Sequence, residues 1–271
     1  MINLLNNKLL PDDYGSIQKA YQSRNGDLSK ELHNSQNDSH NESYHVILGS
    51  EWLKSIIFGG LDGIITIFSI ICSGYASNLS IHTIMILGFA NIIADAISMG
   101  HGDYFSEKTE QDYIKDQYSR ETWEMENHPN GEIKEMIEIY QKKYDISKED
   151  AYYILSNMAN YKQLFIDHMM VLELGLMPPD ENNEPFKNGL ITFTSFIFFG
   201  SIPLIVYILT NMIQWAIIST IITLGLLGYL RSYFTKTNKL YSCFITIING
   251  CISASAAYGV SYAIVYYYPI N

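Results

Sequence analysis

The final part of the chain contains no acidic residues. Residues 188–271 include no Asp or Glu, and their only basic residues are Arg231, Lys236 and Lys239. So few charges are typical of helices that lie in a bilayer. Residues 103–187, in contrast, contain 19 acidic and nine basic residues, a net charge of −10 in a chain of net charge −11. This segregation predicts an integral membrane protein with one hydrophilic domain, disfavours a nucleic-acid partner and favours a cation as substrate.

Cysteine is scarce, and several catalytic motifs are absent. Cys72, Cys243 and Cys251 all lie in apolar stretches and form no CxxC pair, so neither a disulfide framework nor a zinc site is indicated. The sequence has no GxxxxGK[ST] loop, which argues against transport driven by its own ATP hydrolysis. It also has no GxSxG or HExxH string. We therefore expect a protein that is not an enzyme and that holds no prosthetic group.

The N-terminal segment, residues 1–50, is rich in Asn, Ser, Asp and His and shows no sustained periodicity. This composition predicts a largely disordered tail. His33, His40 and His45 could be read as metal ligands, but their irregular spacing is more typical of a polar tail.

Five apolar segments are long enough to cross a bilayer, which requires about 20 residues. Two precede the hydrophilic insert, in residues 51–102, and three follow it, in residues 188–271. The fold class predicted is an all-α integral membrane protein with five transmembrane helices and an acidic domain, residues 103–187, inserted between the second and third spans. The predicted spans are residues 51–75, 80–102, 188–210, 213–230 and 240–268.

The insert is expected to contain three helices. The first continues directly from the second span to Asn127, and the sequence Pro129-Asn130-Gly131 interrupts it. The second covers residues 132–143. Ser147 is a suitable N-cap for the third, which we expect to run to about Leu176, before two consecutive prolines.

The distribution of basic residues predicts the orientation. Lys54, the insert and the loop between the last two spans carry the Lys and Arg residues, whereas the loops on the opposite side carry none. By the positive-inside rule the N-terminus and the acidic domain are cytosolic, and the C-terminus is lumenal or external.

The first span carries a polar stripe. Asp62, Thr66 and Ser69 recur at i, i+4 and i+7, so they share one face of a helix. Gly59 and Gly63 form a small-xxx-small pair, which allows another helix to approach closely.

The second span carries a matching stripe of Asn91, Asp95 and Met99. Because neither stripe can face lipid, the two spans should pack stripe to stripe. A carboxylate inside a membrane is costly and indicates function, here a path for a metal cation. The alternatives are that Asp62 or Asp95 caps a bend or joins two helices, that Met99 only fills space, and that Asn91 only pairs helices.

The insert contains a second group of candidate ligands, spaced for single helix faces. They are Glu121, Glu124, Glu132, Glu135, Met169, Met170 and Glu173. Carboxylates suit divalent Fe and Mn, and a thioether disfavours Ca and Mg. From spacing alone, the favoured reading is a solvated glutamate face with methionines in a small core, because runs of charge usually form solvated faces. His101 and His168 are expected to form local hydrogen bonds rather than bind metal.

Three sequences identify a family resemblance. FGGLDGIITIF at 58–68, ADAISMGHGDYFSEKTE at 94–110 and FIDHMMVLELGL at 165–176 occur in this order within a five-span layout. In these motifs the chain resembles the vacuolar iron transporter family, from about Glu51 to its C-terminus.

The resemblance implies a homodimer, joined through its membrane helices, that moves Fe²⁺ and often Mn²⁺ from the cytosol into a vacuole-like store in exchange for protons. It implies that the second helix extends into a cytosolic three-helix metal-binding domain. It assigns Asp62 and Met99 to the transport pathway. It also assigns the whole set of candidate ligands in the insert to metal binding.

One position departs from the family pattern. The family commonly has a glutamate where this chain has Asn91, and a small residue where it has Asp95. The carboxylate is therefore displaced by one turn on the same helix face, which leaves its role open. Two other functions fit the same residues: a passive divalent-cation channel, or a membrane-anchored metal sensor that does not transport. A diiron enzyme is disfavoured because the insert has no Glu-x-x-His pair.

Overall fold

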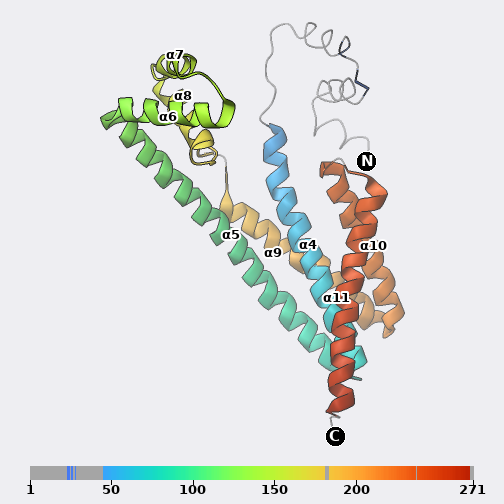
Figure 1. Ribbon diagram of the computed structural model, residues 1–271. Helices are drawn as coiled ribbons and strands as arrows, with labels where there is room; N and C mark the ends of the chain where they lie inside the picture. The colour runs from blue at the N-terminus through green and yellow to red at the C-terminus, as the bar shows by residue number, and fades with distance from the viewer. Residues whose placement is uncertain are drawn as a thin grey trace. The chain divides into compact units, whose positions relative to one another are not determined.

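The computed structural model describes residues 23–24, 26, 28, 45–180, 183–235 and 237–268, and its regular structure within them is entirely α-helical. In the described part of the chain from His45 to Tyr267 there are eight helices, α4 to α11 (Figure 1). The chain divides into two units, residues 1–54 and 55–271, and the predicted sites belong to the second. The predicted disorder of residues 1–50 lies almost wholly outside the described residues.

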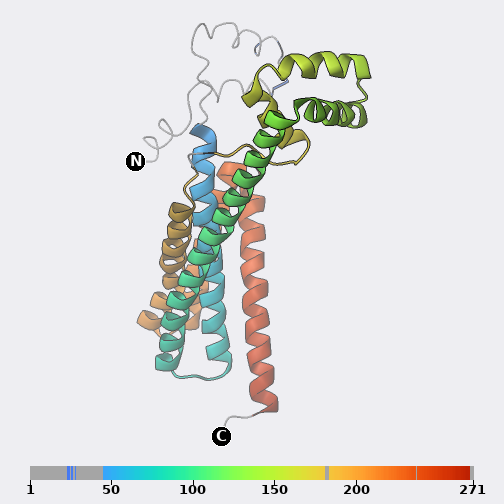
Figure 2. The same cartoon turned by 90° about the vertical axis from the view of Figure 1, so that its left-hand side faces the viewer.

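Five helices of the described chain are long and apolar enough to span a membrane, which confirms the five predicted spans. The loops between consecutive spans are short, except for the hydrophilic insert between the second and third (Figure 2). The helix bounds differ from the predicted segments by a few residues, apart from the continuation of α5 into the insert. The helices are α4 (His45–Ala76), α5 (Ile81–Asn127), α9 (Pro185–Thr210), α10 (Ile213–Thr235) and α11 (Lys239–Tyr267).

The helix α5 is continuous over 47 residues. At 1.5 Å per residue it is about 70 Å long, roughly twice the 30 Å thickness of a bilayer's hydrocarbon core. Ser80 caps its start by accepting a hydrogen bond from the backbone N–H of Thr83 at 3.2 Å. Gly100 and Gly102 do not interrupt it. The predicted continuation of the second span into the insert is therefore confirmed.

Two glycines on α4 allow this helix to pack closely against α9. A Cβ atom on Gly59 would lie 2.5 Å from the carbonyl oxygen of Thr192, and one on Gly63 would lie 2.6 Å from that of Phe196. The small-xxx-small pair on α4 therefore packs on α9, as the spacing predicts for a close helix neighbour. The bundle also contains a core cluster of buried residues to which all five spans contribute. Its members are Ile67, Phe68, Ile71, Cys72, Ile84, Ile92, Leu204, Tyr207, Ala216 and Ala254.

The insert differs from the prediction in its third helix. After α6 (Pro129–Tyr144), the chain forms two short helices, α7 (Lys148–Met158) and α8 (Lys162–Leu172), rather than one. The break occurs where the N–H of Asn160 and the N–H of Tyr161 bond to carbonyls three residues back, which tightens the last turn of α7. The insert thus consists of the end of α5 and three separate helices (Figure 1).

The ends of these helices have local causes. Ser147 accepts a hydrogen bond from the N–H of Asp150 at 3.1 Å, so the predicted N-cap is confirmed, although it begins a shorter helix. At the end of α8, Gly175 has a φ of +68°, and the N–H of Leu176 bonds to the carbonyl of Met170 at 2.9 Å. A glycine in the left-handed conformation commonly follows the end of a helix, because it has no Cβ to clash there. The last helix of the insert therefore ends at Leu172, short of the predicted Leu176.

Candidate metal site and membrane pathway

The five glutamates predicted in the insert lie together. Two come from α5, two from α6, and Glu173 follows the last residue of α8. They form two groups of three, in each of which one carboxylate oxygen per residue lies within 4.8 Å of the others. Glu132 belongs to both groups. The groups are Glu121, Glu124 and Glu132, and Glu132, Glu135 and Glu173.

The deepest of these carboxylates is only partly satisfied. Glu121 is fully buried, and its Oε1 accepts hydrogen bonds from Nη2 and Nε of Arg120 at 2.6 and 3.2 Å. Its Oε2 is also buried and accepts no hydrogen bond within the described residues; the same is true of Oε2 of Glu173. Burying a charged oxygen without a partner is costly, so two such oxygens in one cluster are suited to a bound cation.

The glutamates of the cluster repel one another, which favours the binding of either protons or a metal ion. Burial and repulsion from Glu135, Glu124, Glu121 and Glu173 raise the pKa of Glu132 to about 7. Burial raises the pKa of Glu173 to about 7 as well, together with repulsion from Glu121 and Glu135. A divalent cation would relieve the same repulsion by displacing those protons. Near neutral pH a cation bound here would therefore compete with protons for Glu132 and Glu173.

In the membrane bundle, α4 and α5 are antiparallel with a defined register. Oγ of Ser55 donates to Oδ2 of Asp103 at 3.2 Å. At the opposite end of the pair, a Cβ on Gly74 would lie 2.6 Å from Cγ1 of Ile84. A residue of α4 therefore lies opposite a residue of α5 when their two numbers add up to about 158. This register places Asp62 opposite Asp95, and the two carboxylates interact electrostatically.

The two stripes lie side by side, and their carboxylates lack a hydrogen-bond partner among the residues that the structure describes. Asp62, Asp95 and Met99 are half-buried, and neither carboxylate has a hydrogen bond within the described part of the chain. The side-chain amide of Asn91 instead donates to the carbonyl of Leu87 on its own helix at 2.8 Å. Placing two interacting carboxylates inside a membrane is costly unless a proton or a cation neutralises part of their charge.

Comparisons with known proteins agree with this layout. The sequence model described as the VIT family matches residues 53–262. The chain belongs to the VIT family. It is 36% identical over 269 residues to a vacuolar iron transporter of Toxoplasma gondii, covering 92% of this chain and 87% of the relative. It is 38% identical over 247 residues to one from Plasmodium berghei, covering 87% and 90%, and 29% identical over 225 residues to Arabidopsis thaliana vacuolar iron transporter 1, covering 82% and 88%.

Membership confirms the family resemblance and the expectation that the chain is not an enzyme, because its relatives are transporters. Together with the five candidate spans, it supports metal transport by a multi-pass protein of an intracellular membrane. The VIT-family chain is thus a membrane protein in which one continuous helix carries residues of both candidate sites, Asp95 in the bundle and Glu121 in the insert.

The predicted methionine ligands of this VIT-family chain are fully buried. Met169 belongs to the apolar core of the insert, where it packs with residues such as Met136 and Phe165. Met170, the next residue, is also fully buried but lies outside that core cluster. Of the two readings open from the sequence, the space-filling one describes the surroundings of Met169, and a ligand role for either thioether stays a prediction.

His101 forms a local hydrogen bond, as expected, whereas His168 pairs with a residue of another helix. The ring of His101 pairs through Nδ1 with the carbonyl of Ile97 at 3.3 Å. Nε2 of His168 lies 2.7 Å from the hydroxyl of Tyr140, and burial lowers the pKa of His168.

Sequence reasoning missed a polar junction where α5 approaches the insert. Oδ2 of Asp103 accepts hydrogen bonds from Ser55 on α4 and from the fully buried Thr192 on α9. One turn further along, Asn188 donates to Oε2 of Glu107 at 2.8 Å. A signal was available, because Asp103 and Glu107 continue the stripe of the second span at further steps of four residues.

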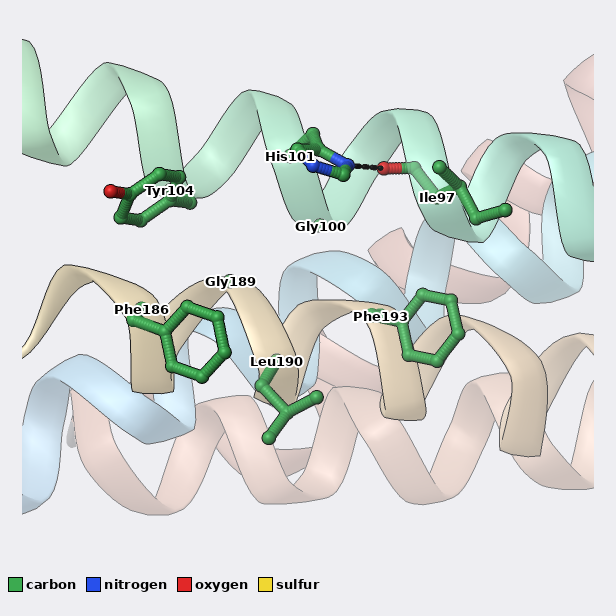
Figure 3. A pocket seen from close by; sticks show the side chains of 8 residues that line it. All are labelled: Ile97, Gly100, His101, Tyr104, Phe186, Gly189, Leu190 and Phe193. Carbon is green, nitrogen blue, oxygen red and sulfur yellow. Dashed lines mark hydrogen bonds between the residues drawn. The ribbon is translucent and has the colours of Figure 1, made fainter.

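A groove between α5 and α9, with a volume of about 380 Å³, lies close to this junction (Figure 3). Its lining is almost wholly apolar and includes no carboxylate, so its chemistry does not suit a metal ion. The lining residues are Ile97, Gly100, His101, Tyr104, Phe186, Gly189, Leu190 and Phe193.

Proposed function

We propose that the protein moves Fe²⁺, with Mn²⁺ as a second possible substrate, from the cytosol into an intracellular store in exchange for protons. Its role would be iron storage and detoxification. The observation that carries this proposal is the pair of buried, unpartnered carboxylate oxygens of Glu121 and Glu173 in the five-glutamate cluster. The names of the relatives, vacuolar iron transporters, support iron as the cargo.

In the proposed mechanism, the cluster captures the metal ion first. Glu121, Glu124, Glu132, Glu135 and Glu173 would supply hard oxygen ligands, and Met169 and Met170 a softer sulfur that disfavours Ca²⁺ and Mg²⁺. Capture would raise the concentration of the ion at the mouth of the membrane pathway.

The ion then passes between α4 and α5. Asp62 and Asp95 would bind it at mid-membrane, with Met99 and Asn91 alongside on the same stripe. Since each carboxylate can hold either a proton or the metal, protons from an acidic lumen would compete for the same oxygens. That competition would couple metal entry into the store to proton exit.

The proposed orientation and assembly follow from charge and burial. The positive-inside rule favours a cytosolic N-terminus and insert and a lumenal C-terminus. The membrane would be that of a vacuole or another acidic compartment, with the endoplasmic reticulum as an alternative. Asp95 and Met99 are only half-buried in one chain. A homodimer through the membrane helices would complete the walls of the pathway.

Uptake into proteoliposomes with an imposed proton gradient tests this function. Wild-type protein should accumulate Fe²⁺ or Mn²⁺ only when the interior is acidic, and Asp62→Ala should reduce uptake to background. Asn91→Ala should cost less than Asp95→Ala, because the Asn91 amide already bonds to Leu87 of its own helix. Equal uptake by wild type and Asp62→Ala would contradict the pathway.

The same assay separates the two rival functions. Uptake that ignores the proton gradient yet requires Asp62 would indicate a cation channel. Binding of Fe²⁺ at the glutamate cluster without any uptake would indicate a metal sensor. Competition among Fe²⁺, Mn²⁺, Co²⁺, Zn²⁺ and Ca²⁺ at varied lumenal pH would then define the cargo.

A further inference from the structure

Arg120 is the one basic residue whose ion pair with the glutamate cluster is seen in the described residues. Both Nε and Nη2 of its guanidinium donate to the same atom, Oε1 of Glu121. Its positive charge also attracts Glu124 and Glu173. The arginine side chain is 48% exposed, whereas the glutamate side chain is fully buried. The Arg120 guanidinium therefore binds Glu121, the deepest carboxylate of the cluster, from the solvent side.

This contact makes the two oxygens of Glu121 unequal. Oε1 is occupied by two charge-assisted hydrogen bonds, whereas Oε2 is buried and accepts none within the described residues. A metal ion that binds Oε2 in the group of Glu121, Glu124 and Glu132 would leave the arginine contact undisturbed. It could use both oxygens only if the guanidinium left Oε1. The geometry thus favours one-oxygen coordination by Glu121.

The number of oxygens matters because metal ions differ in their demands. Ca²⁺ takes six to eight oxygen ligands, commonly with carboxylates that bind through both oxygens. First-row transition ions need fewer ligands and accept single oxygens with nitrogen or sulfur donors. A carboxylate restricted to one oxygen therefore penalises Ca²⁺ more than Mn²⁺ or Fe²⁺.

We propose that Arg120 is a positioning residue that gives the cluster selectivity against Ca²⁺, by holding Glu121 in a one-oxygen binding mode. The proposal rests on the proposed metal-capture function of the cluster and extends it to the discrimination of substrates. Lysine could supply the charge, but it cannot direct N–H groups from two separate nitrogens onto one oxygen, so the effect belongs to the arginine side chain specifically.

The test is metal binding to the purified full-length protein in detergent at one fixed pH. Mn²⁺ and Ca²⁺ are the probes, and the quantity compared is the ratio of their Kd values. Arg120→Gln and Arg120→Lys should both shift this ratio several-fold toward Ca²⁺. Lys115→Gln, an exposed charge on the same helix, should leave it unchanged. Loss of affinity for both ions by the same factor would show a merely structural role and overturn the proposal.

A spectroscopic measurement keeps the proposal falsifiable if the arginine variants fold poorly. The splitting of the carboxylate stretching bands distinguishes one-oxygen from two-oxygen coordination, and a difference spectrum against Glu121→Gln assigns it to Glu121. One-oxygen coordination in Mn²⁺-loaded wild type supports the proposal, and two-oxygen coordination overturns it. If wild type binds neither ion, the capture step of the proposed function fails too. If it binds both and the ratio does not move, only the role of Arg120 fails.

Discussion

The hydroxyl of Ser55 on α4 donates a hydrogen bond to Oδ2 of Asp103 on α5, with an Oγ–Oδ2 distance of 3.2 Å. Thr192 on α9 donates to the same oxygen. One carboxylate therefore joins three spans at the level where α5 leaves the bundle for the insert. Because Ser55 and Thr192 are both buried, the junction also fixes the register that places Asp62 opposite Asp95.

Removing the Thr192 hydroxyl should destabilise the bundle. Thr192→Val keeps the shape of the side chain but deletes a buried donor to a carboxylate, which costs roughly 1.5–3 kcal/mol for a hydrogen bond to a charged group. Thr194→Val is the matched control, since among the described residues that hydroxyl bonds only to carbonyls of its own helix. Thermal unfolding in detergent should show a lower Tm for Thr192→Val alone. Equal losses in the two variants would show that the junction contributes nothing specific.

A methyl group at Gly59 should also destabilise the protein. Its Cβ would lie 2.5 Å from the carbonyl oxygen of Thr192, a backbone atom that cannot move aside cheaply. Gly59→Ala should therefore cost about 1–3 kcal/mol, as overpacking does. Gly102→Ala adds the same methyl where no atom lies within 4 Å, so it should be neutral or, by helix propensity, stabilising by up to about 1 kcal/mol. A Gly59→Ala variant as stable as wild type would contradict the close packing of α4 on α9.

Among the glutamates of the cluster, Glu132 should matter most for metal binding. It belongs to both groups of three, whereas Glu124 and Glu135 each belong to one. Glu132→Gln should lower Mn²⁺ affinity by more than the roughly 10–100-fold typical of losing an outer-shell partner. It should also reduce the number of ions bound at saturation, as measured by titration calorimetry. If Glu135→Gln had the same effect on the number bound, the shared position of Glu132 would have no functional meaning.

The metal-free protein should become less stable as pH rises from about 4.5 to 7. The carboxyl groups of Glu132 and Glu173, with pKa values of about 7, keep their protons in the folded state across this range, whereas in the unfolded chain they ionise near 4.5. The folded state then binds more protons, so the free energy of unfolding falls with rising pH and levels off above 7. Saturating Mn²⁺ at pH 7.5 should restore stability by neutralising the same groups.

The double variant Glu132→Gln and Glu173→Gln provides the control for this prediction. Neither amide titrates, so the Tm of the variant should depend less steeply on pH between 4.5 and 7 than that of wild type. Identical slopes in the two proteins would show that other groups cause the pH dependence.

Much of the architecture could be predicted from local sequence. Apolar length specified the five spans, since a segment that long and that free of charge has few alternatives to a membrane helix. Ser147 identified a helix start because its hydroxyl can satisfy a free N–H within the same turn. The break between α7 and α8 was missed because no proline or glycine marks it, and weak helix formers such as Asn157 and Asn160 only permit a break.

Spacing along single helices put Glu121 and Glu124 on one face, and Asp62 with Thr66 on another, without any knowledge of the fold. Which faces meet depends on contacts between residues far apart in the chain, and only the tertiary structure decided it. Packing of α5, α6 and α8 brought the oxygens of five glutamates close enough together that they could hold a metal ion. Burial then left single oxygens of Glu121 and Glu173 without partners, and placed Arg120 on the other oxygen of Glu121. Periodicity determines what a helix can present, but the partner across the interface determines whether those groups form a site.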